Sequence, residues 1–162
     1  MAEPSLTDIY NFLPIDAHWA TAGQPTVEQF AAIQASGYEV IINLAMPDSP
    51  RAVPSEAELV GAYGIAYIAI PVVWEAPTPA DFTAFCTAMT ANQAKKRFVH
   101  CIANMRVSAF TFLYRVLALG VPVEEAHQAL LQIWEPNPVW RQFIDEQLAT
   151  YLRLNNTTDA AQ

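Results

Sequence analysis

The part of the sequence that decides the fold is the stretch Phe98-Val99-His100-Cys101-Ile102-Ala103-Asn104-Met105-Arg106-Val107-Ser108-Ala109-Phe110. An apolar strand leads into a short loop at Cys101, and a helix is expected from about Arg106 to Leu119. A loop between a strand and a helix N-terminus can direct several backbone N–H groups at one point, and the helix dipole adds partial positive charge there. The stretch therefore predicts an anion-binding loop that begins with a cysteine.

Short apolar strands alternate with helical patterns along the rest of the chain. The strands are expected over Ile15–Ala20, Tyr38–Leu44, Ile65–Val72 and Arg97–His100. Consecutive strands that are separated by helices need crossover connections, and these produce parallel pairing. The sequence therefore predicts an α/β fold with a four-stranded, mainly parallel sheet flanked by helices on both faces. Ligands of such sheets bind at the carboxyl ends of the strands, where Cys101 lies.

Capping residues mark the helix starts. Ser55 and Glu58 have the Ser-x-x-Glu spacing of a capping box, which predicts a helix that stops near Gly64. Thr78 precedes Pro79, and proline is favoured at the first helical position, so another helix is expected there. Further helices are expected over Val123–Trp134 and Pro138–Leu154.

The composition describes a folded, acidic chain. It has 162 residues, of which 53% are hydrophobic and 15% charged, and this is too apolar for a disordered protein. The length suits a single domain over 1–162, with an ordered core over about 8–154. Eight basic and sixteen acidic residues give a net charge of −8, which argues against partners such as nucleic acid or an anionic membrane surface.

Several classes of protein are not indicated. The N-terminus lacks the regions of a signal peptide, and the longest apolar run, Ile65 to Trp74, is too short to span a bilayer. Two cysteines cannot form a disulfide scaffold, so we expect a cytoplasmic protein with free thiols. The three histidines share no metal-ligand spacing, and no glycine-rich nucleotide loop is present, so neither a metal nor a cofactor is expected.

Cys101 and Arg106 stand at the two ends of the predicted loop. The loop amides and the helix dipole favour the thiolate form of a cysteine at this place. The planar guanidinium of Arg106 offers a fork of donors that matches an oxyanion. A thiolate and an arginine around an anion are suited to covalent chemistry on phosphorus or sulfur. Cys86, by contrast, lies on the apolar stripe of a helix and is expected to serve packing.

The order His100-Cys101…Arg106 resembles the signature loop of the cysteine-dependent protein tyrosine and dual-specificity phosphatases. Residues 21–25, the strand end Asn43-Leu44 and the segment 71–75 resemble a bacterial branch of that superfamily. This branch is related to beta-lactamase-hydrolase-like phosphatases and to phosphatase domains fused to NAD kinase. The resemblance covers roughly residues 12–120. It implies the protein tyrosine phosphatase-like sandwich fold and hydrolysis of phosphomonoesters through a cysteinyl-phosphate.

The resemblance also implies roles for individual residues. Cys101 would be the nucleophile, and Arg106 would clamp the phosphate oxygens. Glu75 stands where many members carry Trp-Pro-Asp, so it is the first candidate for the general acid, and Asp81 is the second. His100 would orient the loop. The remaining candidates to contact the substrate anion are Ile102, Ala103, Asn104 and Met105 through their amides, and Ser108 and Arg51 through their side chains.

The loop departs from the phosphatase signature in length. Four residues separate Cys101 from Arg106, where the signature has five, and none of them is glycine. A shorter loop encloses a tetrahedral phosphate less well, so native activity is expected to be weak or lost. Asn104 is the residue that best tolerates a positive φ, and we expect it to adopt one. Val107 stands where the family often has Ser or Thr, and Ser108 lies one step further on.

Two other functions remain open. A loop of this length is also found in rhodanese-type sulfurtransferases, where the cysteine carries a persulfide. The acidic-then-basic strand-end residues typical of rhodaneses are not evident, however. The third alternative is a catalytically inactive module that binds anions or a protein partner, whose nature the sequence leaves open.

Overall fold

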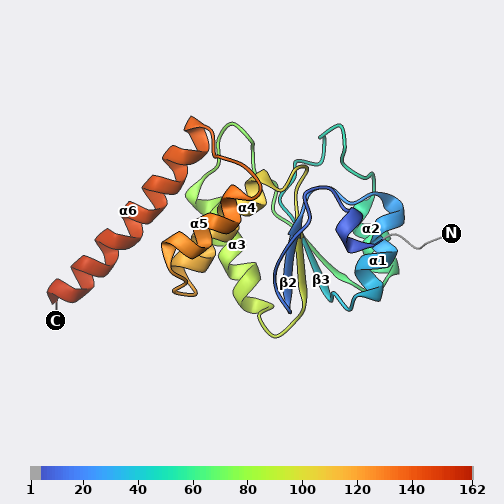
Figure 1. Ribbon diagram of the computed structural model, residues 1–162, viewed down its shortest axis with the longest axis horizontal. Coiled ribbons are helices and arrows are strands. Elements are labelled where there is room, and N and C mark those ends of the chain that lie inside the picture. The colour runs from blue at the N-terminus through green and yellow to red at the C-terminus, as the bar shows by residue number, and fades with distance from the viewer. Residues whose placement is uncertain (1–4, 162) are drawn as a thin grey trace.

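The computed structural model describes residues 5–161, and side chains as far as Arg153. A five-stranded sheet lies at its centre, with helices on both sides (Figure 1). The strands are β1 (Leu13–Asp16), β2 (Trp19–Ala22), β3 (Val40–Asn43), β4 (Ala66–Ala69) and β5 (Arg97–His100). Their order across the sheet is β1-β2-β5-β3-β4, and only the β1–β2 pair is antiparallel. The predicted α/β class with a mainly parallel sheet is confirmed.

The strand predicted over Ile15–Ala20 is wrong, and this accounts for the fifth strand. The chain reverses between Asp16 and Trp19, so the segment is a hairpin of β1 and β2. The Oδ1 atom of Asp16 accepts a hydrogen bond of 2.7 Å from the backbone N–H of His18. Asp forms such local turns readily, because its short side chain reaches the backbone two residues on. Apolar and polar residues alternate over Ile15–Ala20, and this pattern predicts a strand although the segment contains a turn.

The helical elements are the 3-10 turns η1 (Leu6–Asp8) and η2 (Val27–Gln29), and the helices α1 (Phe30–Ala35), α2 (Glu56–Ala62), α3 (Pro79–Ala91), α4 (Met105–Leu117), α5 (Val123–Leu131) and α6 (Pro138–Ala161). The expected helix starts at Pro79, Val123 and Pro138 are confirmed. None of the helices in the described part of the chain combines the length and the hydropathy that a bilayer crossing needs.

The two faces of the sheet bury two separate cores, because side chains alternate along each strand. Val40, Ile42 and Val99 face the core shared with α3 to α6. Ile41 and Phe98 face the smaller core shared with α1 and α2. Figure 1 shows these two groups of helices on opposite sides of the sheet, with the C-terminal end of α6 extending away from the body.

Helix α4 is enclosed on all sides. Every residue from Arg106 to Tyr114 is buried, since the helix packs against β2 and is covered by α3, α5 and α6. A helix that is apolar around its whole circumference is one that is buried around its whole circumference. The N-terminus of α4, and with it the loop from Cys101, is therefore held in place by the core.

The capping box predicted for Ser55 and Glu58 is wrong. Ser55 has a left-handed backbone with a φ of 57°, and its side chain makes no capping hydrogen bond. Glu58 is exposed. The acidic residue of this helix that the fold uses is Glu56, which is buried at the first position of α2.

Candidate active site

The predicted anion loop follows β5 directly. Cys101 is the first residue after the strand and only 1% exposed, among the apolar side chains of the larger core. The loop ends at Met105, where α4 begins. Asn104 has a φ of 64°, so the prediction that it adopts the left-handed conformation is confirmed.

Asn104 is locked to the N-terminal part of the chain by its side-chain amide. Its Nδ2 donates to the backbone oxygen of Asn11 at 2.8 Å and to Oγ1 of Thr21 at 3.1 Å. In return, Nδ2 of Asn11 donates to the backbone oxygen of Ala103 at 3.0 Å. Asn11 also has a positive φ, of 50°. These two asparagines therefore hold the loop and the N-terminal part of the chain together by reciprocal hydrogen bonds.

Gly23 lies against the loop next to Tyr10, the neighbour of Asn11. The backbone N–H of Gln24 donates to the oxygen of Ile102 at 2.9 Å. This brings the chains so close that a Cβ on Gly23 would lie 2.6 Å from the same oxygen. Glycine is therefore required here by close approach of two backbones.

These contacts orient two peptide groups of the loop. The oxygens of Ile102 and Ala103 point at Gln24 and Asn11. No peptide bond of the described chain is cis, and the C=O and N–H of a trans peptide point in opposite directions. The N–H groups of Ala103 and Asn104 thus point away from Gln24 and Asn11.

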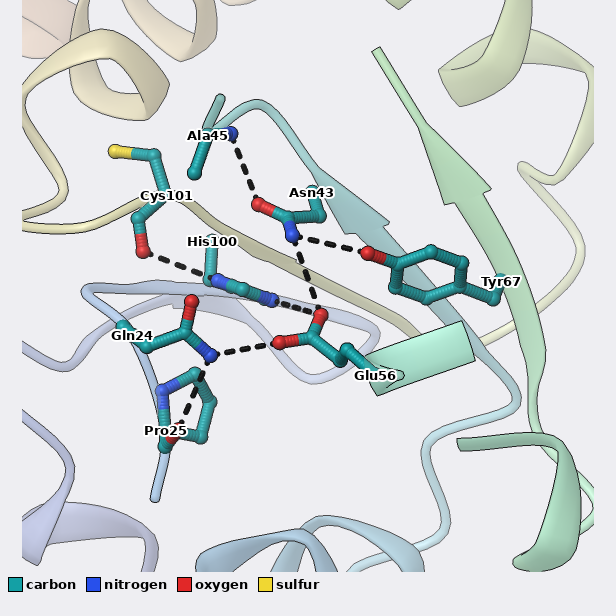
Figure 2. A network of polar contacts seen from close by, with 8 residues as sticks. All are labelled: Gln24, Pro25, Asn43, Ala45, Glu56, Tyr67, His100 and Cys101. Carbon is teal, nitrogen blue, oxygen red and sulfur yellow. Dashed lines mark hydrogen bonds and ion pairs between the residues drawn. The ribbon is translucent and has the colours of Figure 1, made fainter. Parts of the chain in front are cut away.

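A buried polar network lies beneath the loop (Figure 2). One ring nitrogen of His100, Nδ1, lies 3.0 Å from the backbone oxygen of Cys101, and the other, Nε2, lies 2.8 Å from Oε2 of Glu56. Nε2 of Gln24 donates to Oε1 of Glu56 at 2.7 Å. Nδ2 of Asn43 donates to Oε2 of Glu56 at 3.3 Å. The network joins β3, β5, α2 and the turn after β2.

Burial and hydrogen bonding act in opposite directions on Glu56. Burial alone would raise the pKa of its carboxyl group, because a charge is poorly solvated there. The hydrogen bond and the charge of His100, and the hydrogen bonds of Gln24 and Tyr67, outweigh burial and hold the pKa of Glu56 below its usual value. Burial raises the pKa of Tyr67 to about 12, so this phenol stays neutral.

Arg106 is buried beside an aromatic cluster. Its guanidinium carbon lies 5.5 Å from the ring centroid of Trp74. Trp74 in turn packs against Trp134 and Trp140, with centroid distances of 5.4 and 5.8 Å. Nε1 of Trp140 donates to the backbone oxygen of Trp74 at 2.9 Å. Helix α6 therefore anchors the segment that precedes Glu75.

The two candidate acids lie in different settings. Glu75 is exposed in the turn after Trp74, and its carboxylate has no partner among the side chains that the structure describes. Asp81 closes a capping box with Thr78: the N–H of Thr78 donates to Oδ2 of Asp81, and the N–H of Asp81 to Oγ1 of Thr78, each at 3.1 Å. The carboxylate of Asp81 is thus engaged at the start of α3.

The remaining predicted contacts lie around the loop. Oγ of Ser108 donates to the backbone oxygen of Met105 at 2.9 Å and accepts from Nε1 of Trp134 at 3.0 Å. The exposed Arg51 lies over the ring of Tyr10, at 5.5 Å, and Tyr10 borders Gly23. The hydroxyl of Ser108 is therefore engaged by Met105 of α4 and by Trp134.

The packing role predicted for Cys86 is confirmed. Cys86 lies on α3 against the larger core, and burial raises the pKa of its thiol to about 11. It remains protonated and unreactive at neutral pH. Within the described chain, no three His, Cys, Asp or Glu side chains are grouped so that they could hold a metal ion.

Sequence reasoning missed Glu56 and Asn11. Glu56 lies 44 positions before His100 in the chain, and Asn11 lies 92 positions before Ala103. Of these residues, only Glu56 has a local feature in the sequence, because it stands at the start of a helix. Acidic residues in that position usually face solvent, so the feature does not indicate a buried role. These partners are set by tertiary packing, which no short motif encodes.

No protein-family model matches the chain. Among solved structures, a candidate phosphatase of the DUF442 family from Shewanella putrefaciens CN-32 is similar, with a TM-score of 0.81 and 32% identity. The similarity covers 90% of this chain and 96% of that one. PTPMT1 has the same fold at 15% identity, with a TM-score of 0.75 over 89% of this chain and 98% of its own. Tk-PTP has it at 16%, with a TM-score of 0.69 over 87% and 95%.

The fold is that of the protein tyrosine phosphatase-like proteins. More narrowly, the chain belongs to the DUF442 family of phosphatase-like proteins. Two beta-lactamase hydrolase-like proteins from strains of Xylella fastidiosa are 33% identical over 107 residues, which is 64% of this chain. The chain spans only 24% of the length of those relatives. The resemblance to the phosphatase superfamily is confirmed.

Proposed function

We propose that the protein uses Cys101 as a nucleophile and hydrolyses phosphomonoesters, with low turnover, through a cysteinyl-phosphate. The observation that carries this proposal is the loop itself, in which Cys101 directly after β5 and Arg106 in the first turn of α4 flank two peptides whose N–H groups point away from Gln24 and Asn11. Membership of a phosphatase-like family supports the same chemistry.

The reaction needs two displacements at phosphorus. The thiolate of Cys101 attacks, an S–P bond forms, and the bond to the leaving oxygen breaks with its electron pair on that oxygen. The leaving oxygen takes a proton from an acid or from water. Water then attacks phosphorus, the S–P bond breaks, and the thiolate and inorganic phosphate are released. The guanidinium of Arg106 would donate to the non-reacting oxygens in both steps.

Three observations support low turnover. The loop is one residue shorter than in the phosphatase signature. Cys101 is almost fully enclosed. Of the candidate acids, Glu75 lies on an exposed turn and Asp81 is held in a helix cap. Aryl phosphates should therefore react better than alkyl phosphates, because a phenolate leaves more easily without a proton.

A second function, sulfur transfer, is favoured by the same loop length and by the setting of the acids. Thiosulfate has a leaving group, sulfite, that is stable as an anion and needs no acid. The thiolate of Cys101 would attack the outer sulfur, and the S–S bond would break with its electron pair on sulfite. Cyanide would then take the outer sulfur from the persulfide as thiocyanate, which returns the thiolate.

Two free cysteines support a site of action in the cytoplasm, where thiols stay reduced. An oxyanion of low charge is the expected substrate, because the net charge of −8 repels polyanions. Neither the net charge nor the family membership points to a protein partner, and the proposed reaction needs none.

The test compares para-nitrophenyl phosphate hydrolysis with thiocyanate formation from thiosulfate and cyanide. We expect Cys101→Ser to abolish aryl phosphate turnover, whereas the matched control Cys86→Ser retains it. Undiminished hydrolysis by Cys101→Ser overturns the proposal. A faster Cys101-dependent production of thiocyanate assigns the protein to sulfur transfer instead. Anion binding without either reaction assigns it to the binding modules.

The role of loop length has its own test. Insertion of one glycine between Ala103 and Asn104 restores the length of the phosphatase signature. We expect aryl phosphate turnover to rise, since the larger loop encloses a tetrahedral phosphate better. A folded insertion variant without this gain contradicts the argument from length.

A further inference from the structure

We propose that Glu56 is a positioning residue that keeps His100 doubly protonated and thereby stabilises the thiolate of Cys101. This inference rests on the proposed function in that it takes Cys101 as the nucleophile. It assigns a role to a side chain that lies outside the loop and does not touch the substrate. Figure 2 shows Glu56 on the far side of His100 from Cys101.

The Nδ1 atom of His100 lies 3.0 Å from the backbone oxygen of Cys101. A carbonyl oxygen can only accept a hydrogen bond. Nδ1 must therefore carry a proton, whatever the state of the other ring nitrogen.

The side-chain amides of Gln24 and Asn43 donate hydrogen bonds to Glu56. The backbone N–H of Ala45 donates to Oδ1 of Asn43, which leaves Nδ2 of Asn43 facing Glu56. Nε2 of Gln24 also donates to the backbone oxygen of Pro25, which fixes the orientation of that amide. Both amides thus present N–H donors to Glu56, and neither can accept a proton from it.

The carboxylate form of Glu56 satisfies all of its neighbours. As an acceptor-only group, it can take hydrogen bonds from Gln24, from Asn43 and from a protonated Nε2 of His100. The lowered pKa of Glu56 agrees with this form. Tyr67 is the other titratable side chain in this network, and its raised pKa keeps it neutral. The hydrogen bonds of this network are therefore complete when both ring nitrogens of His100 carry a proton.

Cys101 lies in apolar surroundings, which by themselves disfavour a thiolate. The imidazolium is 0% exposed, so water screens its charge poorly. Through the Nδ1 contact, its charge lies against the backbone of Cys101, while the balancing charge of Glu56 lies on the far side of the ring. The arrangement favours negative charge on the sulfur.

The experiment measures thiol ionisation and not turnover, so its failure differs from failure of the proposed function. In a Cys86→Ser background, Glu56→Gln is compared with Glu58→Gln, a matched change at an exposed position of the same helix. The rate of Cys101 alkylation by iodoacetamide is followed against pH by mass spectrometry. We expect the midpoint of this profile to rise by about one pH unit in Glu56→Gln only. An unchanged midpoint in folded Glu56→Gln overturns the proposal.

A second measurement decides the matter even if Glu56→Gln does not fold. The imidazole nitrogens of His100 are observed by ¹⁵N NMR in the full, unmodified chain, with His18→Gln and His127→Gln variants for assignment. We expect both nitrogens of His100 to be protonated at pH 7. A neutral ring, protonated at Nδ1 alone, overturns the proposal.

Discussion

The guanidinium of Arg106 lies over the indole of Trp74, 5.5 Å from the ring centroid. Among the described residues, no carboxylate pairs with this buried arginine, and its Nε has no partner. The aromatic face thus takes the place of the anion that usually supports a buried cation. Because Nε of Arg106 has no hydrogen-bond partner, its N–H is a candidate donor to an oxyanion.

We predict that Trp74→Ala weakens the binding of thiosulfate or phosphate by about 2- to 30-fold. This range corresponds to the roughly 0.5–2 kcal/mol of a cation–π contact. Trp74→Phe, which keeps an aromatic face, should lose less. Isothermal titration calorimetry measures both affinities, and equal affinities of wild type and folded Trp74→Ala would contradict the assignment.

Gly23 and Gly61 form a matched pair for testing the close approach at the loop. We predict that Gly23→Ala destabilises the protein by about 1–3 kcal/mol, because the new Cβ would lie 2.6 Å from the backbone oxygen of Ile102. Gly61 lies within α2, and a Cβ at this position would meet nothing within 4 Å. Gly61→Ala should stabilise by about 0.5–1 kcal/mol. Urea unfolding gives both values, and a neutral Gly23→Ala would show that the loop can yield.

Asn104 combines a left-handed backbone with two side-chain hydrogen bonds, and substitutions can separate these effects. Asn104→Ala loses the two hydrogen bonds and also fits the left-handed backbone poorly. Asn104→Gly loses only the hydrogen bonds, because glycine adopts this backbone without strain. We predict that both variants are destabilised and that the alanine variant is worse by about 1 kcal/mol. Thermal unfolding followed by circular dichroism tests this order. The reverse order would mean that φ at this position costs nothing.

The lowered pKa of Glu56 predicts a loss of stability in acid. The folded state binds the proton of Glu56 less tightly than the unfolded state does. The contribution of ionised Glu56 to the free energy of unfolding is therefore complete above its ordinary pKa of 4.5. The contribution is lost as the pH falls below 4.5 and through the lower folded value. We expect the free energy of unfolding to fall in this window, with a shallower fall in Glu56→Gln. Urea titrations from pH 3 to 7 measure it, and parallel curves would refute the link.

Much of the fold was predictable, because it rests on local patterns. The strand Arg97–His100 was predicted with its observed bounds, since Phe98 and Val99 are apolar at its centre and a short loop follows it. The strained position was predictable too, because Asn104 is the loop residue that best tolerates a positive φ. The hairpin at Asp16 was not, since the alternation of apolar and polar residues over Ile15–Ala20 is typical of one continuous strand.

The candidate site divides along the same line. By itself, the sequence determined the α/β class, the place of Cys101 and Arg106 at the two ends of one loop, and the packing role of Cys86. These depend on residues that are neighbours in the chain or share one helix face. Only the tertiary structure decided that Glu56 lies under His100, that Gly23 lies against Ile102 and that Trp74 supports Arg106. Such partners meet because burying apolar surface brings distant segments together, and that sum over the whole chain has no local signature.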